Sequence, residues 1–267
     1  MIPSPFEYEV AESVEHAVEL LGSDDAKLIA GGHSLLPLMR LRVVRPALLV
    51  DVGRLGELRY VRKANGGVAI GSLTRHHDLA SDALLRERCP LLAHAASLVG
   101  DPQVRHRGTI GGSVAHGDPA SDLPTVLVAL EADLVLRGPD GERAVAAGDF
   151  FRGVFETALG SRDVLTEIRV PAATGGYVKF NRRAQDWATV AVAVARVNDN
   201  VRVGLTSMGP TPLRARAVEE ALAAGAPPAE AAGHAAEGTD PPSDTNGSAE
   251  HRRHLARVLV RRALETI

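Results

Sequence analysis

The sequence predicts an α+β protein with two domains, and three observations support this prediction. Its 267 residues are enough for one large domain or for two of ordinary size. The first part of the chain alternates short helix and strand patterns, and a hairpin pattern follows further on. Pro171 and the Ala-Ala-Thr-Gly-Gly run after it then interrupt the regular patterns, as a domain junction does. We therefore expect one domain over residues 1–172 and a smaller α+β domain over residues 173–267.

The first subdomain, at about residues 1–55, is expected to be a small α/β unit. Ser13 is a suitable N-cap and Gly22 a natural stop for the amphipathic helix between them. Residues 27–30 and 47–51 read as strands joined by a crossover connection. Strands joined in this way pair in parallel, so the sequence predicts a small parallel sheet.

The second subdomain, at about residues 56–172, is expected to combine short strands and helices. Pro90 is placed to open a helix, because proline fits the first helical position. Residues 133–137 and 142–145 flank a Gly-Pro-Asp-Gly turn and predict a hairpin. Residues 164–170 predict a further strand just before the junction.

The second domain has a less regular pattern. Residues 177–182 and 201–208 read as strands, whereas periodicity alone cannot decide the type of the apolar run at 187–197. Residues 225–248 are rich in Ala, Pro, Gly and Asp and predict a surface excursion, ordered by what it touches. A final helix is expected from about Ala249. The residues expected on one face of this helix are Leu255, Val258, Leu259 and Arg262.

Composition excludes several classes of function. A net charge of -3 and a pI of about 6.4 give no electrostatic reason to expect nucleic acid or an anionic membrane as a partner. Cys89 is the single cysteine, so the chain alone can hold neither an iron–sulfur cluster nor a tetrahedral zinc site. The N-terminus lacks a signal-peptide pattern, and no run is apolar enough to insert in a membrane. These features fit a protein of the reducing cytoplasm.

Two glycine pairs mark the segments that we expect to carry chemistry. The pair in residues 30–35 follows a predicted strand directly, where the backbone turns away from the sheet and can present N–H groups to a phosphate. The pair in residues 109–113 lies between hydroxyl side chains and predicts a second anion nest. Two nests suit a pyrophosphate. The Rossmann and phosphate-loop spacings are both missing, which disfavours those nucleotide-binding folds.

The glycine segments and several later motifs resemble those of one known family. The motifs are Ala30-Gly31-Gly32-His33-Ser34-Leu35-Leu36-Pro37, Thr109-Ile110-Gly111-Gly112-Ser113 with its continuation through Pro124, Leu165-Thr166-Glu167-Ile168-Arg169-Val170-Pro171, Lys179-Phe180-Asn181-Arg182-Arg183 with Asp186-Trp187-Ala188, and the C-terminal stretch from His251 to Leu264. With them the chain resembles the FAD-binding medium subunit of the molybdenum hydroxylases, the family of the carbon monoxide dehydrogenase and xanthine dehydrogenase flavoprotein subunits. The resemblance covers nearly the whole chain.

The resemblance implies a PCMH-type FAD-binding domain of two subdomains, followed by a C-terminal domain of the carbon monoxide dehydrogenase flavoprotein type. FAD would be bound noncovalently, with its pyrophosphate and ribityl chain wrapped by the backbones of the two glycine segments. Asp122 would accept hydrogen bonds from a sugar hydroxyl, Leu165 would contact the cofactor, and Lys179 would approach the polar edge of the flavin. The cofactor-binding residues implied in this way are Ile29, Ala30, Gly31, Gly32, His33, Ser34, Leu35, Leu36, Thr109, Ile110, Gly111, Gly112, Ser113, Asp122, Leu165, Lys179 and Trp187.

The chain departs from the family pattern at three positions. Ser113 stands where many relatives have Asn, and Gly117 where Ala or Asn is more usual, so side-chain contacts there do not transfer. Trp187 stands where relatives often have Phe or Tyr. It either stacks on the flavin ring or fills the core.

Some histidines have competing interpretations. His33 lies in a Gly-His-Ser loop like that of an unrelated group of flavin oxidases with covalent flavin, but the nearer resemblance favours noncovalent binding. His116 and Asp118 are either neighbours of the flavin or caps of a helix that starts near Asp122. The adjacent pair His76 and His77 could suggest a metal, but a polar helix beginning at Thr74 explains it as well.

The leading interpretation is an electron-transfer flavoprotein subunit with two partners. A 2Fe-2S small subunit would deliver electrons to FAD, and a molybdenum-binding large subunit would hydroxylate the substrate. The acceptor would be NAD, a quinone or oxygen. A stand-alone FAD-dependent oxidoreductase of the same fold and a scaffold module without flavin are the alternatives. The substrate, the acceptor and the oligomeric state cannot be read from this chain.

Overall fold

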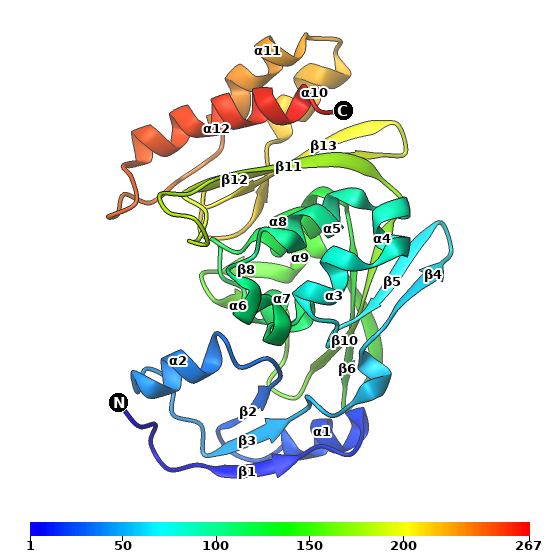
Figure 1. The fold of residues 1–267 in the computed structure, drawn as a ribbon, viewed down its shortest axis with the longest axis vertical. Helices are drawn as coiled ribbons and strands as arrows, with labels where there is room; N and C mark the ends of the chain where they lie inside the picture. The colour runs from blue at the N-terminus through cyan, green and yellow to red at the C-terminus, as the bar shows by residue number, and fades with distance from the viewer.

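The computed structural model describes residues 1–267, and its main sheets follow one another along the long axis of the molecule (Figure 1). The first sheet is parallel and three-stranded, in the order β1 (Glu7–Val10), β3 (Leu48–Asp51), β2 (Ala26–Ile29). Helices α1 (Val14–Leu20) and α2 (Leu35–Arg40) make the crossovers. The predicted parallel pair is therefore confirmed, as is the N-cap Ser13, whose side chain accepts a hydrogen bond from the His16 N–H at 3.1 Å. Edge strand β1 was not predicted, because its mostly exposed side chains follow no buried pattern.

The second sheet is antiparallel and five-stranded. Its strands in spatial order are β4 (Val61–Ala64), β5 (Gly67–Gly71), β10 (Val164–Pro171), β6 (Asp133–Gly138) and β7 (Gly141–Ala146). The predicted hairpin β6–β7 and the predicted strand β10 are both confirmed. The helical elements of this part are η1 (Gly56–Leu58), α3 (His76–Ser81), α4 (Ala83–Arg88), α5 (Pro90–Ser97), α6 (Pro102–Arg107), α7 (Ile110–His116), α8 (Asp122–Ala129) and α9 (Ala147–Phe150). A small hairpin joins β8 (Phe151–Gly153) to β9 (Glu156–Thr157).

The third sheet is antiparallel and four-stranded. Its order is β11 (Thr174–Phe180), β12 (Val190–Val197), β13 (Asn200–Thr206), β14 (Leu213–Arg214). The chain then forms α10 (Arg216–Ala223), α11 (Pro228–Ala231), η2 (Ala232–Ala236) and α12 (Ala249–Leu264). Figure 1 shows these last helices on one face of the sheet, with α8 and α5 on the other. The α+β class is thus confirmed. None of the helices is both long and apolar enough to cross a membrane.

Strand β12 explains why periodicity could not decide the run at 187–197. Val190, Val192 and Val194 belong to the apolar core under α12. The intervening Ala191, Ala193 and Ala195 belong to the core shared with α5 and α8. Because both faces of the strand are buried, its sequence has no polar alternation.

Helix α8 is the central helix of this packing. All of its residues are buried, and it lies between the second sheet's core and the third sheet. Gly204 on β13 allows the close approach, since a Cβ there would lie 2.7 Å from the Thr125 carbonyl oxygen and 3.2 Å from the Ala129 Cβ. The third sheet is therefore seated directly on the helix backbone.

Two predictions for the C-terminal part were wrong in detail. Residues 225–248 are more than a surface excursion, because they include α11 and η2, whose alanines are buried against α12. On α12, Leu255 and Leu259 are buried as expected, but Arg262 is exposed. The buried face instead includes small side chains such as Ala256 and Ala263. A pattern of large apolar residues alone does not identify such positions as buried.

We predict that Gly204→Ala destabilises the protein by about 1–3 kcal/mol, because the added methyl group overpacks the contact with α8. Urea unfolding of the variant and the wild type measures the difference. Gly148→Ala is the matched control, since a Cβ at Gly148 meets no atom within 4 Å. Equal losses in both variants would contradict the proposed contact.

Glu167 on β10 predicts how stability depends on pH. Burial opposes its ionisation, but hydrogen bonds from Tyr60, Arg62 and Arg169 outweigh burial and hold the pKa of Glu167 below its usual value. Its contribution is therefore complete above the ordinary Glu pKa of about 4.3 and disappears as the pH falls through the lower folded-state value.

We expect Glu167→Gln to unfold at lower urea concentration at neutral pH, with the difference from wild type shrinking in acid. Urea midpoints measured across the acid range test this. Glu15→Gln, which removes an exposed ion pair with Arg137, is the control and should change the midpoints little. A difference for Glu167→Gln that stays constant with pH would refute the assignment.

Candidate cofactor-binding site

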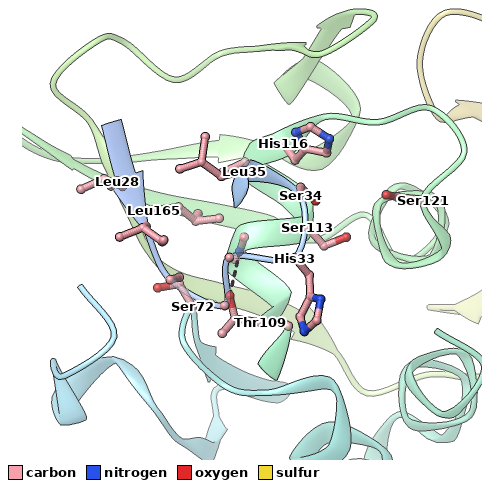
Figure 2. Close-up of a pocket in the computed structure, with 18 of the residues that line it drawn as sticks. Leu28, His33, Ser34, Leu35, Ser72, Thr109, Ser113, His116, Ser121 and Leu165 are labelled. Carbon is pink, nitrogen blue, oxygen red and sulfur yellow. Dashed lines mark hydrogen bonds between the residues drawn. The ribbon is translucent and has the colours of Figure 1, made fainter. Parts of the chain in front are cut away.

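The main cavity has a volume of about 970 Å³ and lies where the three main sheets meet. This volume is at the upper end for a small-molecule site and suits a large cofactor. Its walls come from the β2–α2 loop, from α7, from the β8–β9 hairpin and from β11 with the loop after it. Figure 2 shows residues of both glycine segments around this pocket.

The first glycine pair forms a tight turn after β2, as predicted. Gly32 has a φ of 79°, which only glycine adopts without strain. Gly31 is pressed against the chain between α6 and α7, because a Cβ there would lie 2.4 Å from the Arg107 carbonyl oxygen. The backbone N–H groups of residues 31–34 donate no hydrogen bond within the protein. This turn can therefore donate hydrogen bonds to the oxygens of an anion.

The second glycine pair differs from the prediction. Residues 110–113 form the first turn of α7, with Thr109 as its N-cap, and the Thr109 hydroxyl accepts from the Gly112 N–H at 3.1 Å. The other N–H groups of this turn donate to the carbonyls of Thr74, Ser72 and Thr109. The predicted second anion nest is thus wrong, because its donors are all used. Gly111 instead allows α7 to pack closely against Ser72, since a Cβ at Gly111 would lie 2.5 Å from the Ser72 Cβ.

A buried ion pair forms part of the wall. The Lys179 ammonium lies 2.9 Å from Oδ2 of Asp122 and also donates to the Leu98 carbonyl at 3.3 Å. The two charged side chains are 6% and 4% exposed, so the pair is shielded from solvent. Tyr177 donates to Oδ1 of the same carboxylate at 2.6 Å. Tyr177 and Lys179 are two residues apart on β11, so they point to the same side of the strand, toward the start of α8.

Burial is the largest influence on the pKa values of Asp122 and Tyr177. It raises the pKa of Asp122, while Lys179 and Tyr177 oppose the increase by stabilising the charged form. Burial and the nearby carboxylate raise the pKa of Tyr177 well above its usual value, so its hydroxyl remains a donor. The three side chains form one coupled unit.

His76 is a buried pocket residue that sequence analysis did not assign to the site. Its ring lies against Gly108, where a Cβ would come within 2.8 Å of the ring. Burial, with His33 and Arg105 nearby, lowers the pKa of His76 to about 4, so the ring is neutral at pH 7. Its Nδ1 has no hydrogen-bond partner in the chain. The helix expected from Thr74 begins at His76 itself, and His77 stacks on His106 with ring centres 4.0 Å apart.

The structure brings together most of the predicted site residues. All of them line the cavity except Leu36, which is exposed on α2, and Ile110, which points into the core. Trp187 is 56% exposed at the cavity's edge, which excludes core filling. His116 lines the cavity, whereas Asp118 does not.

Neither His116 nor Asp118 caps α8. The Asp118 carboxylate accepts from the Ala120 N–H at 2.8 Å, and Ser121 occupies the N-cap position. Sequence analysis also missed Ser72, Phe155 and Tyr177. Of these, Tyr177 was the easiest to predict from the sequence, because it lies two residues before Lys179 on a predicted strand and so points to the same side.

A cavity of this size, with unpaired N–H groups at one wall, suits an extended cofactor that carries phosphate. Comparison with known families and proteins identifies the cofactor. Residues 4–173 match the FAD binding domain in molybdopterin dehydrogenase. Residues 176–267 match the CO dehydrogenase flavoprotein C-terminal domain.

Two relatives match over nearly their whole length. The carbon monoxide dehydrogenase medium chain of Hydrogenophaga pseudoflava is 45% identical, with 99% of this chain and 97% of the relative covered. The glyceraldehyde dehydrogenase medium chain of Sulfolobus acidocaldarius is 38% identical, with both chains covered completely. A solved structure of the H. pseudoflava carbon monoxide dehydrogenase superimposes with a TM-score of 0.96 over 99% of this chain and 98% of that one.

The chain therefore belongs to the family of FAD-binding medium subunits of the molybdenum hydroxylases. The resemblance stated from the motifs is confirmed, together with FAD as the cofactor and oxidoreductase as the class of activity.

We predict that Gly31→Ala lowers FAD affinity by about tenfold or more, because the new Cβ must displace either the turn or the segment at Arg107. Bound FAD measured by fluorescence after purification tests this. Gly56→Ala, at a position where a Cβ meets no atom within 4 Å, is the control. Retention of full affinity by Gly31→Ala would mean that the tight turn is not required.

Proposed function

We propose that this chain binds FAD noncovalently and passes electrons from a 2Fe-2S small subunit to an external acceptor. A molybdenum-binding large subunit would carry out the hydroxylation of the substrate. The observation that carries the proposal is the cavity of about 970 Å³ with the unpaired N–H groups of residues 31–34 at one wall and the Asp122–Lys179 pair at another. We also propose residues 1–172 and 173–267 as the two domains, with subdomains at about 1–55 and 56–172.

The residues present fit FAD. The free N–H groups of the first glycine turn would bind the pyrophosphate, since an anion satisfies several such donors at once. The first turn of α7 would approach the same phosphates with its positive end, and Gly111 allows this turn to lie close to Ser72. Ser34 and Ser113 would add hydroxyl donors.

The buried pair would serve the sugar and the flavin. A carboxylate has about four lone-pair sites, and Asp122 uses one on each oxygen within the protein, so it can still accept from a sugar hydroxyl. Lys179 has three N–H donors and uses two, which leaves one for the polar edge of the flavin. FAD, when bound, supplies the redox chemistry. Leu165 would contact the cofactor, and Trp187 at the cavity's edge would cover the ring.

The cysteine content and the relatives support this division of labour among subunits. Cys89 is buried, and burial raises the pKa of its thiol to about 11, so it stays an inert core residue. An iron–sulfur cluster must therefore be held by another chain. Relatives whose names refer to carbon monoxide and to glyceraldehyde have medium chains similar to this one, which supports a choice of substrate made on another subunit. NAD, a quinone or oxygen would be the acceptor, and the cytoplasm the compartment.

Purification of the tagged chain from its native host, with partners retained, tests the proposal. We expect flavin absorption bands, release of free FAD on acid precipitation, and copurifying molybdenum and iron. Flavin that stays in the pellet would contradict noncovalent binding and implicate His33, which lines the cavity. FAD without metals would favour a stand-alone oxidoreductase. A protein that neither contains nor binds FAD would favour a scaffold.

A further inference from the structure

Tyr177 is buried behind the cofactor cavity and does not line it. It is 3% exposed and forms part of the core shared by α5, α8 and the third sheet. Its hydroxyl is nevertheless directed at a site residue, because it donates to Oδ1 of Asp122 at 2.6 Å. The other oxygen of the same carboxylate accepts from Lys179. The two donors therefore hold Asp122 by both of its oxygens.

This arrangement joins two parts of the chain. Asp122 is the first residue of α8, whereas Tyr177 and Lys179 both belong to β11. A carboxylate at the start of a helix interacts favourably with the helix dipole, but that interaction does not fix its rotation. Two donors at fixed positions on a strand do fix it.

We propose that Tyr177 is a positioning residue of the cofactor site, whose hydroxyl orients Asp122 and keeps it paired with Lys179, so that one arrangement of donors and acceptors faces FAD. This inference rests on the proposed function of the cavity. By this inference, Tyr177 in the third sheet influences cofactor affinity through Asp122, without touching the cofactor itself.

The charge state of Asp122 gives the inference a distinct readout. The titratable groups that face its carboxyl are Lys179 and Tyr177, both from β11, and Leu98, the C-cap of α5, offers its neutral carbonyl to Lys179. Removing the Tyr177 hydroxyl takes a donor from the ionised form, which raises the pKa of Asp122 further. A change in packing alone would leave this titration unaltered.

The test is Tyr177→Phe, introduced into the tagged chain and purified with its partner subunits. The ring and its packing are retained, and only the hydroxyl is lost. We expect FAD affinity, measured by flavin fluorescence during reconstitution, to fall about tenfold, the usual effect of removing a hydrogen bond to a charged group. We also expect the pH at which affinity is lost on acidification to move upward.

Tyr60→Phe is the matched control. The Tyr60 hydroxyl donates to the buried Glu167 carboxylate at 2.6 Å, so the same chemical change is made outside the cavity. This control should lower thermal stability without altering FAD affinity or its pH dependence. A parallel loss of FAD in both variants would show a general effect of stability and overturn the inference.

A double-mutant cycle tests whether the effect of Tyr177→Phe depends on Asp122. In an Asp122→Asn background, Tyr177→Phe should cause little further loss, because the carboxylate that the hydroxyl orients is gone. Additive losses would overturn the inference, as would a Tyr177→Phe variant with the affinity and pH profile of the wild type. Failure of the wild-type complex to bind FAD would instead refute the proposed function itself.

Discussion

The burial of α8 on all sides is the constraint on which the rest of the structure depends. A helix with no exposed face must be contacted by the second sheet's core and the third sheet at once. Polar groups tie it in place along its length: Asp122 to β11 at its start, Thr125 to the Thr206 hydroxyl at 2.7 Å in its middle, and Glu131 just beyond its end to Arg202 and Arg214. The third sheet can therefore neither slide nor rotate on the helix without breaking several contacts.

This constraint also shapes the cofactor site. An unpaired buried charge is strongly unfavourable, so Asp122 and Lys179 are stable in the wall only when α8 and β11 are docked together. Replacing such a pair by apolar residues is often neutral for stability, which suggests that its value lies in fixing one arrangement of the wall. Asp122 on α8 and Lys179 on β11 both line the cavity, and this part of the wall forms only when the helix and the strand are docked together.

Motifs predicted the site better than periodicity predicted the fold. The glycine pairs, Asp122 and Lys179 could be found because resemblance marks them, and nearly all of the implied residues line one cavity. The hydrogen-bond state of α7 could not be predicted, since the carbonyl groups of Thr74 and Ser72, which accept from the N–H groups of its first turn, come from a distant segment. Strand β12 and Tyr177 escaped for a related reason. Burial on both faces and a hydroxyl aimed at α8 are properties of the packed sheets, not of local sequence.

The two glycine segments look alike in sequence, but they have different physical tasks. Gly31 and Gly32 produce a turn whose N–H groups are left without partners, so this segment can bind an anion. Gly111 and Gly112 lie in a helical turn whose N–H groups are all satisfied, so their contribution is the absence of side chains near Ser72 and Thr109. An alanine in the first segment would therefore displace the free N–H groups of the turn. An alanine in the second would clash with Ser72 or Thr109. A pair of glycines in the sequence thus indicates a close approach of the backbone to a neighbouring group. Whether that backbone can also bind a ligand depends on which of its N–H groups are free of hydrogen bonds within the protein.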